Sequence, residues 1–447
     1  MDYDTINLIG LQPKDIQDIN IIRDDKTVYV NVTLIKKSYV CPCCGSIKTI
    51  VKDYKNKTII HSILNTNKCV INYRCRRYIC KDCRKTFQED NPFTVSFSKI
   101  SNATAIQVLK DLKRPNYTFS SVAEKNNISV STVVNIFDQY VDMMPGRIPR
   151  VLSIDEFYLG NGFKDKFACV FVNWETGKII DIYPSRKKHK LHSYTQYMNK
   201  DEFDNVKYVS IDMNPTYRNF AHHFFKNCTV MVDSFHVVKN INEALNNLRI
   251  SIMGKYDNKS TEYYLLKNWN KLLLMRKGNI EDNEPRYNKK LGYSLNKPQL
   301  LELILKIDPV LKAAYNWKED YLDFNEDYTF ETAGERYDQL YSRLVLLNIH
   351  QFQDVITFLK NWRTEIINSF ILIDKRRISN GPIESINSRI KMILKTSLKY
   401  KNFERLRQRI MYCVNKDSLP TMSRPKISNK QPGKERGKYN KIDKKQL

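Results

Sequence analysis

The sequence predicts an α/β protein of several domains, and three features of the chain support that prediction. The chain has 447 residues and 42% hydrophobic side chains, enough for roughly two to four buried cores at about 150 residues per domain. Seven of its ten cysteines lie between residues 41 and 83. After Arg150 the pattern changes to short apolar runs separated by turns, and after Val238 it becomes helical and aromatic. We therefore expect a cysteine-rich front end, an α/β core and an all-α segment.

The chain is strongly basic, with a formal net charge of +26 and an isoelectric point near 9.5. A basic surface attracts polyanions, because contact with a phosphate backbone releases bound counterions. The sequence shows no apolar run of membrane-spanning length, no N-terminal signal pattern and no lipidation signal. We therefore expect a cytoplasmic protein that binds nucleic acid and has no membrane partner.

Residues 1–97 predict N-terminal strands followed by a zinc ribbon. Two cysteine pairs, Cys41/Cys44 and Cys80/Cys83, each hold two residues between their thiols. This spacing lets both thiolates of a tight turn reach one tetrahedral Zn²⁺, so we expect one structural zinc ion and a reducing compartment. Cys43 adds a further thiol to the first pair, which leaves open which thiols bind the metal.

Three arginines lie on the segment between the two cysteine pairs. The segment alternates like a strand and carries Arg74, Arg76 and Arg77 beside Tyr73 and Tyr78. Such an edge would suit contacts with DNA phosphates. A solvated strand face without a ligand fits the same residues equally well.

Residues 98–145 predict a helix-turn-helix domain. In this register Ala123 lies where two helices cross, Asn127 occupies the turn position that favours a left-handed backbone, and Val133 and Ile136 face the core. The second helix would offer three side chains to base edges of double-stranded DNA: Ser131, Thr132 and Asn135. A helical hairpin without a DNA role is the alternative.

Residues 146–238 show, in order, a strand, a two-stranded hairpin, a helix, a strand, a helix and a fifth strand. This succession is expected of an RNase H-like α/β core. The helical pattern of 239–374 predicts an all-α insertion, after which 375–415 supply the final helices of the core. The Lys-rich residues 416–447 are poor in apolar side chains and predict a disordered tail.

Two aspartates each end an apolar strand of this core. A carboxylate at the end of an apolar strand is costly unless it faces a site, and Asp155 and Asp212 both occupy such positions. On neighbouring strands they could hold divalent ions between them, and oxygen ligands favour Mg²⁺ or Mn²⁺. Two aspartates that only form turns would give the same pattern.

A third acid lies in the predicted helix that follows Pro382. Asn380 offers a cap, and Glu384, Asn387 and Lys391 form a stripe beside a buried isoleucine stripe. Glu384 could complete the metal site, with Asn387 and Lys391 beside a bound DNA strand. A glutamate in a first helical turn also stabilises the helix dipole without any catalytic role.

The chain resembles the DDE transposases of the ISL-three insertion-sequence family. The resemblance rests on the cysteine-paired ribbon and on the segments IDEF, SIDMNPTY, VDSFHVVKNINEALNNLR and GPIESINSRIK, and it extends to about residue 413. It implies an RNase H-like core whose catalytic triad is Asp155, Asp212 and Glu384. Asp233 and His236 match an aspartate and histidine that related transposases carry after the fifth strand, which implies a supporting role.

The resemblance implies a transposase that binds terminal inverted repeats and catalyses DNA cleavage and strand transfer with two Mg²⁺ or Mn²⁺ ions. It further implies a homo-oligomer on element ends and target DNA, associated with the nucleoid in a bacterial cytoplasm. Two other functions remain as alternatives. A regulator that only binds DNA has no reason to carry the three acids, and a nuclease that only hydrolyses DNA would lack strand transfer.

Overall fold

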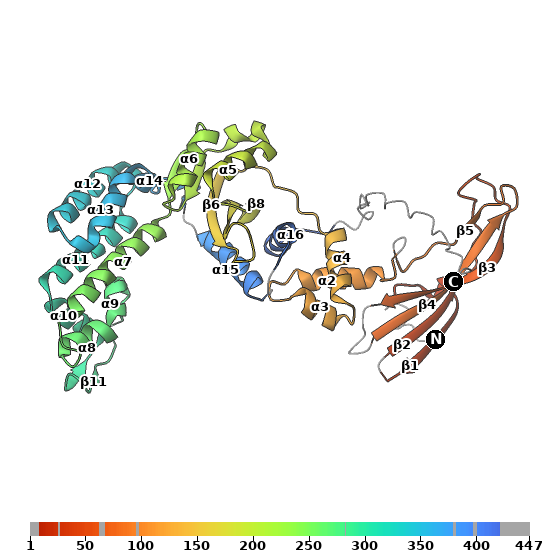
Figure 1. Cartoon of the computed structure of the whole chain (residues 1–447), viewed down its shortest axis with the longest axis horizontal. Helices are drawn as coiled ribbons and strands as arrows, with labels where there is room; N and C mark the ends of the chain where they lie inside the picture. Colours follow the sequence, from red (N-terminus) through yellow and green to blue (C-terminus); the bar gives the residue numbers. More distant parts are fainter. Residues whose placement is uncertain are drawn as a thin grey trace, which may run out of the picture. The chain divides into compact units, whose positions relative to one another are not determined.

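The computed structural model describes residues 9–25, 27–61, 68–94, 98–281, 283–378, 381–396 and 400–420 (Figure 1). The protein is a mixed α/β protein whose chain forms two compact units. The first unit contains the described residues up to Met143 together with those from Gln408 onward, and the second spans Met144–Arg407. Within the described ranges, none of the helices combines the length and apolar character that a membrane crossing needs.

The first unit begins with a five-stranded sheet. Its elements are the short 3-10 helix η1 (Pro13–Asp15) and strands β1 (Ile16–Asp24), β2 (Thr27–Leu34), β3 (Thr49–His61), β4 (Lys68–Cys80) and β5 (Thr86–Gln88). The strand order is β1-β2-β4-β3, and β5 also pairs with β4. Because β4 is 13 residues long, its first half pairs with β2 and its last residues pair with β5. One strand therefore joins the N-terminal strands to the second cysteine pair.

Three helices follow: α2 (Asn102–Leu112), α3 (Phe119–Lys125) and α4 (Val130–Tyr140). A hydroxyl side chain caps the N-terminus of each helix by accepting a backbone N–H bond. The turn between α3 and α4 has a φ of 47° at Asn127, and Ala123 is 3% exposed, as the sequence pattern predicts. Val133 and Ile136 are buried in the core of this small domain.

The end of helix α16 (Phe403–Val414) completes the same helical core. Tyr412 is buried there, and its hydroxyl donates to the Leu109 carbonyl over 3.1 Å. The buried guanidinium of Arg409 donates to the Arg114 and Tyr117 carbonyls after α2. The sequence-based division placed all of 375–415 in the α/β core, whereas these contacts place the residues from Gln408 onward with α2–α4. Helical periodicity identifies a buried face but not the domain that buries it.

The second unit is built on another five-stranded sheet, with order β10-β9-β6-β7-β8. Its strands are β6 (Val151–Tyr158), β7 (Phe167–Asn173), β8 (Lys178–Tyr183), β9 (Tyr208–Ile211) and β10 (Thr229–Val232). β6, β7 and β8 are antiparallel, whereas β6, β9 and β10 run parallel. The connections contain α5 (Lys188–Tyr194), η2 (Thr195–Tyr197), η3 (Lys200–Asn205) and α6 (Pro215–Phe224). The succession of elements is the one predicted from the sequence.

Helices cover both faces of this sheet. On one face, Ile154, Ile211 and Val232 join the largest core together with Phe220 of α6. On the other face lies α15 (Gly381–Thr396), which contacts β6 through a hydrogen bond between Asn387 and Asp155. Helix α15 therefore covers the face of the sheet that carries the Asp155 side chain.

A helical segment is inserted between β10 and α15. Figure 1 shows α7 running from the sheet into this bundle. The helices are α7 (Ser234–Met253), α8 (Thr261–Asn268), α9 (Asn270–Leu274), α10 (Lys297–Lys306), α11 (Pro309–Asp327), α12 (Phe330–Leu347), α13 (Gln353–Asn361) and α14 (Arg363–Asn368), with η4 (Lys277–Asn279) and η5 (His350–Phe352). The insertion is not entirely helical, because β11 (Arg286–Asn288) pairs with β12 (Tyr293–Leu295). A second short hairpin, β13 (Leu372–Ile373) with β14 (Arg376–Arg377), precedes α15.

Candidate active site and cysteine cluster

Three aspartates form a row across the parallel strands β6, β9 and β10. The last residues paired between these strands are Ile154, Ile211 and Val232. An aspartate follows each of them: Asp155, Asp212 and Asp233. The ladder extends to the row itself, because the Asp233 N–H donates to the Ile211 carbonyl over 3.1 Å. Side chains alternate between the faces of a sheet, so the three carboxyls lie opposite the isoleucine and valine side chains.

Asp155 lies within β6 and not at its end, which corrects the sequence-based expectation. The strand continues to Tyr158 because β7 pairs with it on the far side from β9. Asp155 nevertheless follows the last residue of β6 that pairs with β9. Asp212 directly follows β9, as the sequence predicted.

The first two carboxyls of the row are costly to ionise together. Asp155 is 7% exposed, and its burial raises the pKa of that carboxyl. Burial also raises the pKa of Asp212 to about 7, with further repulsion from the charges of Asp155 and Glu156. A nearby cation would relieve this repulsion and favour the ionised forms.

Unpaired oxygen atoms lie at the same place. Asp212 Oδ1 and Asn387 Oδ1 are buried, and neither has a hydrogen-bond partner among the residues that the structure describes. The Nδ2 atom of Asn387 donates to Asp155 Oδ2 over 2.7 Å, so the amide oxygen remains available next to the carboxyl row. Buried oxygens without donors are rare in proteins, and carboxylate and amide oxygens are ligands for hard divalent cations. This donor set fits a divalent metal ion.

The third aspartate of the row, Asp233, interacts with a histidine side chain. Asp233 is the N-terminal cap residue of α7, and its Oδ2 lies 3.0 Å from His236 Nδ1. The hydrogen bond with Asp233 raises the pKa of His236, and the charges of Asp155 and Asp212 raise it further. These interactions favour the protonated form of the imidazole, whereas its burial opposes that form.

Glu384 lies near this group but is not assembled with it. It is exposed in the first turn of α15, three residues before Asn387 and thus on the same side of the helix. Lys391 is exposed one turn after Asn387. In the described segments, no three carboxylates lie close enough together to share one ion. The expected cap residue Asn380 lies outside the described residues.

Glu156 was not assigned a role by the sequence, although it follows Asp155 directly. Strand alternation puts its side chain on the opposite face, where Oε2 accepts a hydrogen bond from the Tyr217 hydroxyl over 2.9 Å. Arg186 forms an ion pair with its other oxygen. Glu156 therefore links β6 to α6 and to the segment before α5, on the face of the sheet opposite the acidic row.

Four cysteines of the first unit form a compact cluster. Their sulfur atoms all lie within 4.8 Å of one another, and the set is Cys41, Cys44, Cys80 and Cys83. Cys43 is exposed and does not belong to it. Such a tetracysteine cluster could hold one structural zinc ion.

The two cysteine turns have the same backbone geometry. The N–H of Gly45 donates to the Cys41 carbonyl over 2.9 Å, and the N–H of Arg84 donates to the Cys80 carbonyl over 3.1 Å. Both donors have positive φ angles, 71° for Gly45 and 59° for Arg84. Backbone N–H groups of the second turn also lower the pKa of the Cys80 thiol to about 6. The pKa of the Cys41 thiol is lowered in the same way, which favours the thiolate form that a metal ion requires, whereas the neighbouring thiols raise the pKa of Cys44 and Cys83.

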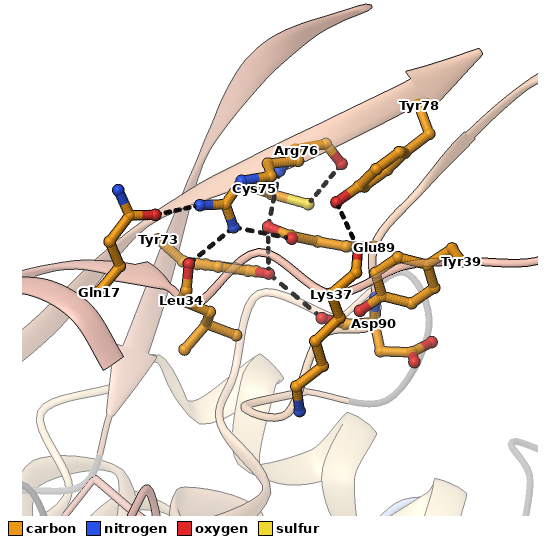
Figure 2. Close-up of polar contacts among 10 residues, drawn as sticks. All are labelled: Gln17, Leu34, Lys37, Tyr39, Tyr73, Cys75, Arg76, Tyr78, Glu89 and Asp90. Carbon is orange, nitrogen blue, oxygen red and sulfur yellow. Dashed lines mark hydrogen bonds and ion pairs between the residues drawn. The ribbon is translucent and has the colours of Figure 1, made fainter. Parts of the chain in front are cut away.

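Arg76 is not available for contact with DNA, which corrects the expectation from the sequence. Its side chain is 3% exposed and donates to Glu89 Oε2 over 3.2 Å and to the Leu34 carbonyl over 2.7 Å, and it also bonds to Gln17 (Figure 2). Glu89 accepts two more hydrogen bonds, from the Tyr73 hydroxyl and the Arg76 N–H. The guanidinium is therefore a structural link between β1, β2, β4 and the residue after β5.

The other two arginines of β4 lie closer to solvent. Arg74 is exposed, with its guanidinium carbon 4.2 Å from the ring centroid of Tyr54. Arg77 is partly exposed and pairs with Asp53, with Nε 2.9 Å from Oδ1. Arg74 consequently offers the more accessible charge.

The three side chains that we expect to contact DNA bases lie on α4. Ser131 and Asn135 are exposed, and Thr132 is partly exposed. The hydroxyls of Ser131 and Thr132 each lie 2.8 Å from the Oγ of Ser129, the cap residue. Asn135 thus presents its amide without such a local contact among the described residues.

Comparison with known families identifies the class of protein. A family model described as a transposase matches residues 152–410, more than half of the chain, so the protein is a transposase, an enzyme that cuts and transfers DNA. The chain belongs specifically to the ISL3 family of DDE transposases, which confirms the resemblance seen in the sequence. No curated protein matches the chain.

Proposed function

We propose that this transposase cleaves DNA at the ends of an insertion sequence and joins those ends to target DNA. The acidic row carries the proposal: Asp212 has a buried oxygen without a partner and lies beside the buried carboxyl of Asp155. A protein that only bound DNA would gain nothing from this costly arrangement. Membership of the transposase family supports the same conclusion.

The sheet topology supports an RNase H-like core. Three antiparallel strands are followed by two parallel strands on the other side of β6, with helices on both faces. In this arrangement, the first and fourth strands are neighbours, which brings Asp155 and Asp212 together although they are far apart in the sequence.

Asp155 and Asp212 would hold Mg²⁺ or Mn²⁺, the ions that oxygen ligands favour. The chemistry that two bound ions supply is activation of a water or DNA 3′-hydroxyl and stabilisation of the leaving oxygen. Asn387 positions Asp155 through its 2.7 Å hydrogen bond. His236, held by Asp233, would balance the negative charge of the row and of a DNA phosphate.

We assign Glu384 as the third catalytic acid. It lies one turn before Asn387 on the helix that contacts β6, and its exposure leaves the carboxylate free to turn toward bound DNA and metal. Lys391, on the same helix, would contact the phosphate backbone of the bound strand.

The N-terminal unit would recognise the terminal inverted repeats as double-stranded DNA. Ser131, Thr132 and Asn135 on α4 would face base edges in the major groove. Arg74 and Arg77 would contact phosphates, and the cysteine cluster would hold one zinc ion that stabilises the ribbon. Cleavage of two element ends implies a homo-oligomer on DNA.

The direct test uses purified protein with labelled element ends and a target plasmid. With Mg²⁺ we expect cuts at the element boundary and joined products in the plasmid. Cuts without joined products would support a nuclease that only hydrolyses DNA. Binding to the ends without any cut in Mg²⁺ or Mn²⁺ would leave only a DNA-binding role.

A further inference from the structure

An aromatic side chain is exposed next to the acidic row. Phe235 is the second residue of α7, between Asp233 and His236, and it is 56% exposed. Its ring stands at 88° to the His236 imidazole, with the ring centroids 5.8 Å apart. The buried stripe of α7 begins only at Val237, so packing of the helix does not account for a large apolar ring at this position.

Phe235 begins a stripe along the outer side of α7. Lys239, Asn242 and Asn246 follow it at offsets of four, seven and eleven residues, which is the spacing of one helical face. The stripe therefore combines an aromatic ring, a cation and two amides. Phe235 is the member of this stripe nearest to Asp233 in the sequence, and the other three side chains lie progressively further along α7.

An open hollow of about 270 Å³ lies along this stripe. It is lined by Leu274 of α9 and by six residues of α7: Phe235, Val238, Lys239, Asn242, Glu243 and Asn246. The ammonium of Lys239 lies 3.9 Å from Glu243 Oε1, and both side chains are largely exposed. Within it, Asn242 Oδ1 is buried and has no hydrogen-bond partner among the described residues. The volume is below the range of about 300–1,000 Å³ typical of pockets for drug-sized ligands, and suits a single planar group.

We propose that this hollow receives one unpaired nucleotide of the DNA beside the scissile phosphate, with Phe235 stacked against its base. Its position favours this occupant, because Phe235 is two residues from Asp233 in the acidic row. Its chemistry does so too: an aromatic face stacks on any base, an amide oxygen accepts from a base edge, and a lysine neutralises a phosphate. Phe235 would thus be a positioning residue for cleavage, an inference that rests on the proposed function.

The test compares two DNA substrates, a fully paired element end and the same end with one mismatched nucleotide beside the cleavage point. Phe235→Ala should cut the paired end about tenfold or more slowly than wild type, since it loses the stacking that stabilises the unpaired base. Phe235→Trp should retain the activity. On the mismatched end, the alanine variant should recover to within about twofold of wild type, because the DNA is already unpaired.

Phe330→Ala is the matched control, since Phe330 is the first residue of α12 and is 41% exposed. It should cut both substrates like wild type. A Phe235→Ala protein that cuts paired ends at the wild-type rate, or is equally slow on both substrates, overturns the inference. A changed oligomeric state with an unchanged ratio between substrates would also overturn it, in favour of a second copy as the occupant. If wild type cuts neither substrate, it is the proposed function that fails.

Discussion

Asn387 donates a hydrogen bond from Nδ2 to Asp155 Oδ2 over 2.7 Å, and this contact joins α15 to the first strand of the core. The two residues are 232 positions apart, with the whole helical insertion between them. The contact fixes the helix that carries Glu384 next to the carboxyl row. It therefore connects the helix of the exposed Glu384 to the buried carboxyl of Asp155, which lies beside Asp212.

Asn387→Ala should lower Mg²⁺-dependent cleavage by about 10- to 100-fold, the usual effect of removing a residue that orients a metal ligand. The loss should be partly rescued by higher Mg²⁺ concentration, because the ligands themselves remain. Ser388→Ala, at the exposed neighbouring position, is the control and should cut normally. Equal activity of both variants would show that the Asn387 contact has no part in the reaction.

The pH dependence of stability should report the desolvated carboxyl of Asp212. Its pKa is about 7 in the folded protein, against about 3.9 in an unfolded chain. Between these values the folded state binds more protons, so this group costs stability above pH 7 and the cost disappears as the pH falls towards 4. Asp212→Asn should thus stabilise the protein at pH 8, by an amount on the order of 2–4 kcal/mol, and much less at pH 5.

Thermal or urea unfolding of wild type and Asp212→Asn, both without Mg²⁺ or Mn²⁺, measures this difference. Adding Mg²⁺ at pH 8 should stabilise wild type more than the variant. The same stability difference at pH 5 and pH 8 would mean that the charge of Asp212 is not its cause.

The cysteine cluster should bind one zinc ion per chain. The double variant Cys80→Ser, Cys83→Ser should lose the metal and unfold the ribbon, because closed thiolate sites contribute folding energy directly. Cys43→Ser is the matched control, since Cys43 is exposed and outside the cluster. Metal analysis decides the assignment, and zinc that persists in the double variant or is lost from Cys43→Ser would contradict it.

Two arginines of β4 should respond differently to substitution. Arg76→Ala breaks a buried ion pair and should cost about 3–5 kcal/mol of stability. Arg74→Ala removes an exposed charge and should leave the fold intact while it weakens binding to all DNA sequences and reduces the salt slope by about one. Melting and salt-dependent binding separate the two effects. A stable Arg76→Ala protein with a purely salt-sensitive binding defect would show instead that Arg76 contacts DNA phosphates.

Local patterns were sufficient for several features. Strand succession in the core follows from alternation and turn residues, and the cysteine cluster follows from pair spacing. The left-handed Asn127 and the buried Ala123 follow from the constraints of a tight turn between crossing helices. Each of these features depends on residues that are close in the sequence.

Other features depend on contacts between distant segments, which no local pattern reveals. Arg76 resembles an exposed strand arginine until Gln17, Leu34 and Glu89 surround it from other parts of the chain. The row that Asp233 shares with Asp155 is set by strand register across the parallel part of the sheet. Family resemblance indicated Asp233, but its place in the row required the structure.

The central claim, that the acidic row and Glu384 form a metal-dependent cleavage site, is tested most directly by cleavage of bound element ends in Mg²⁺. Asp155→Asn, Asp212→Asn and Glu384→Gln should each slow cleavage by about 1,000-fold or more, equivalent to about 4 kcal/mol, while end binding and folding persist. Glu302→Gln, an exposed acid on α10, should cut like wild type. A Glu384→Gln protein that cuts at the wild-type rate would remove the third acid, and wild-type cleavage by Asp155→Asn or Asp212→Asn would contradict the account.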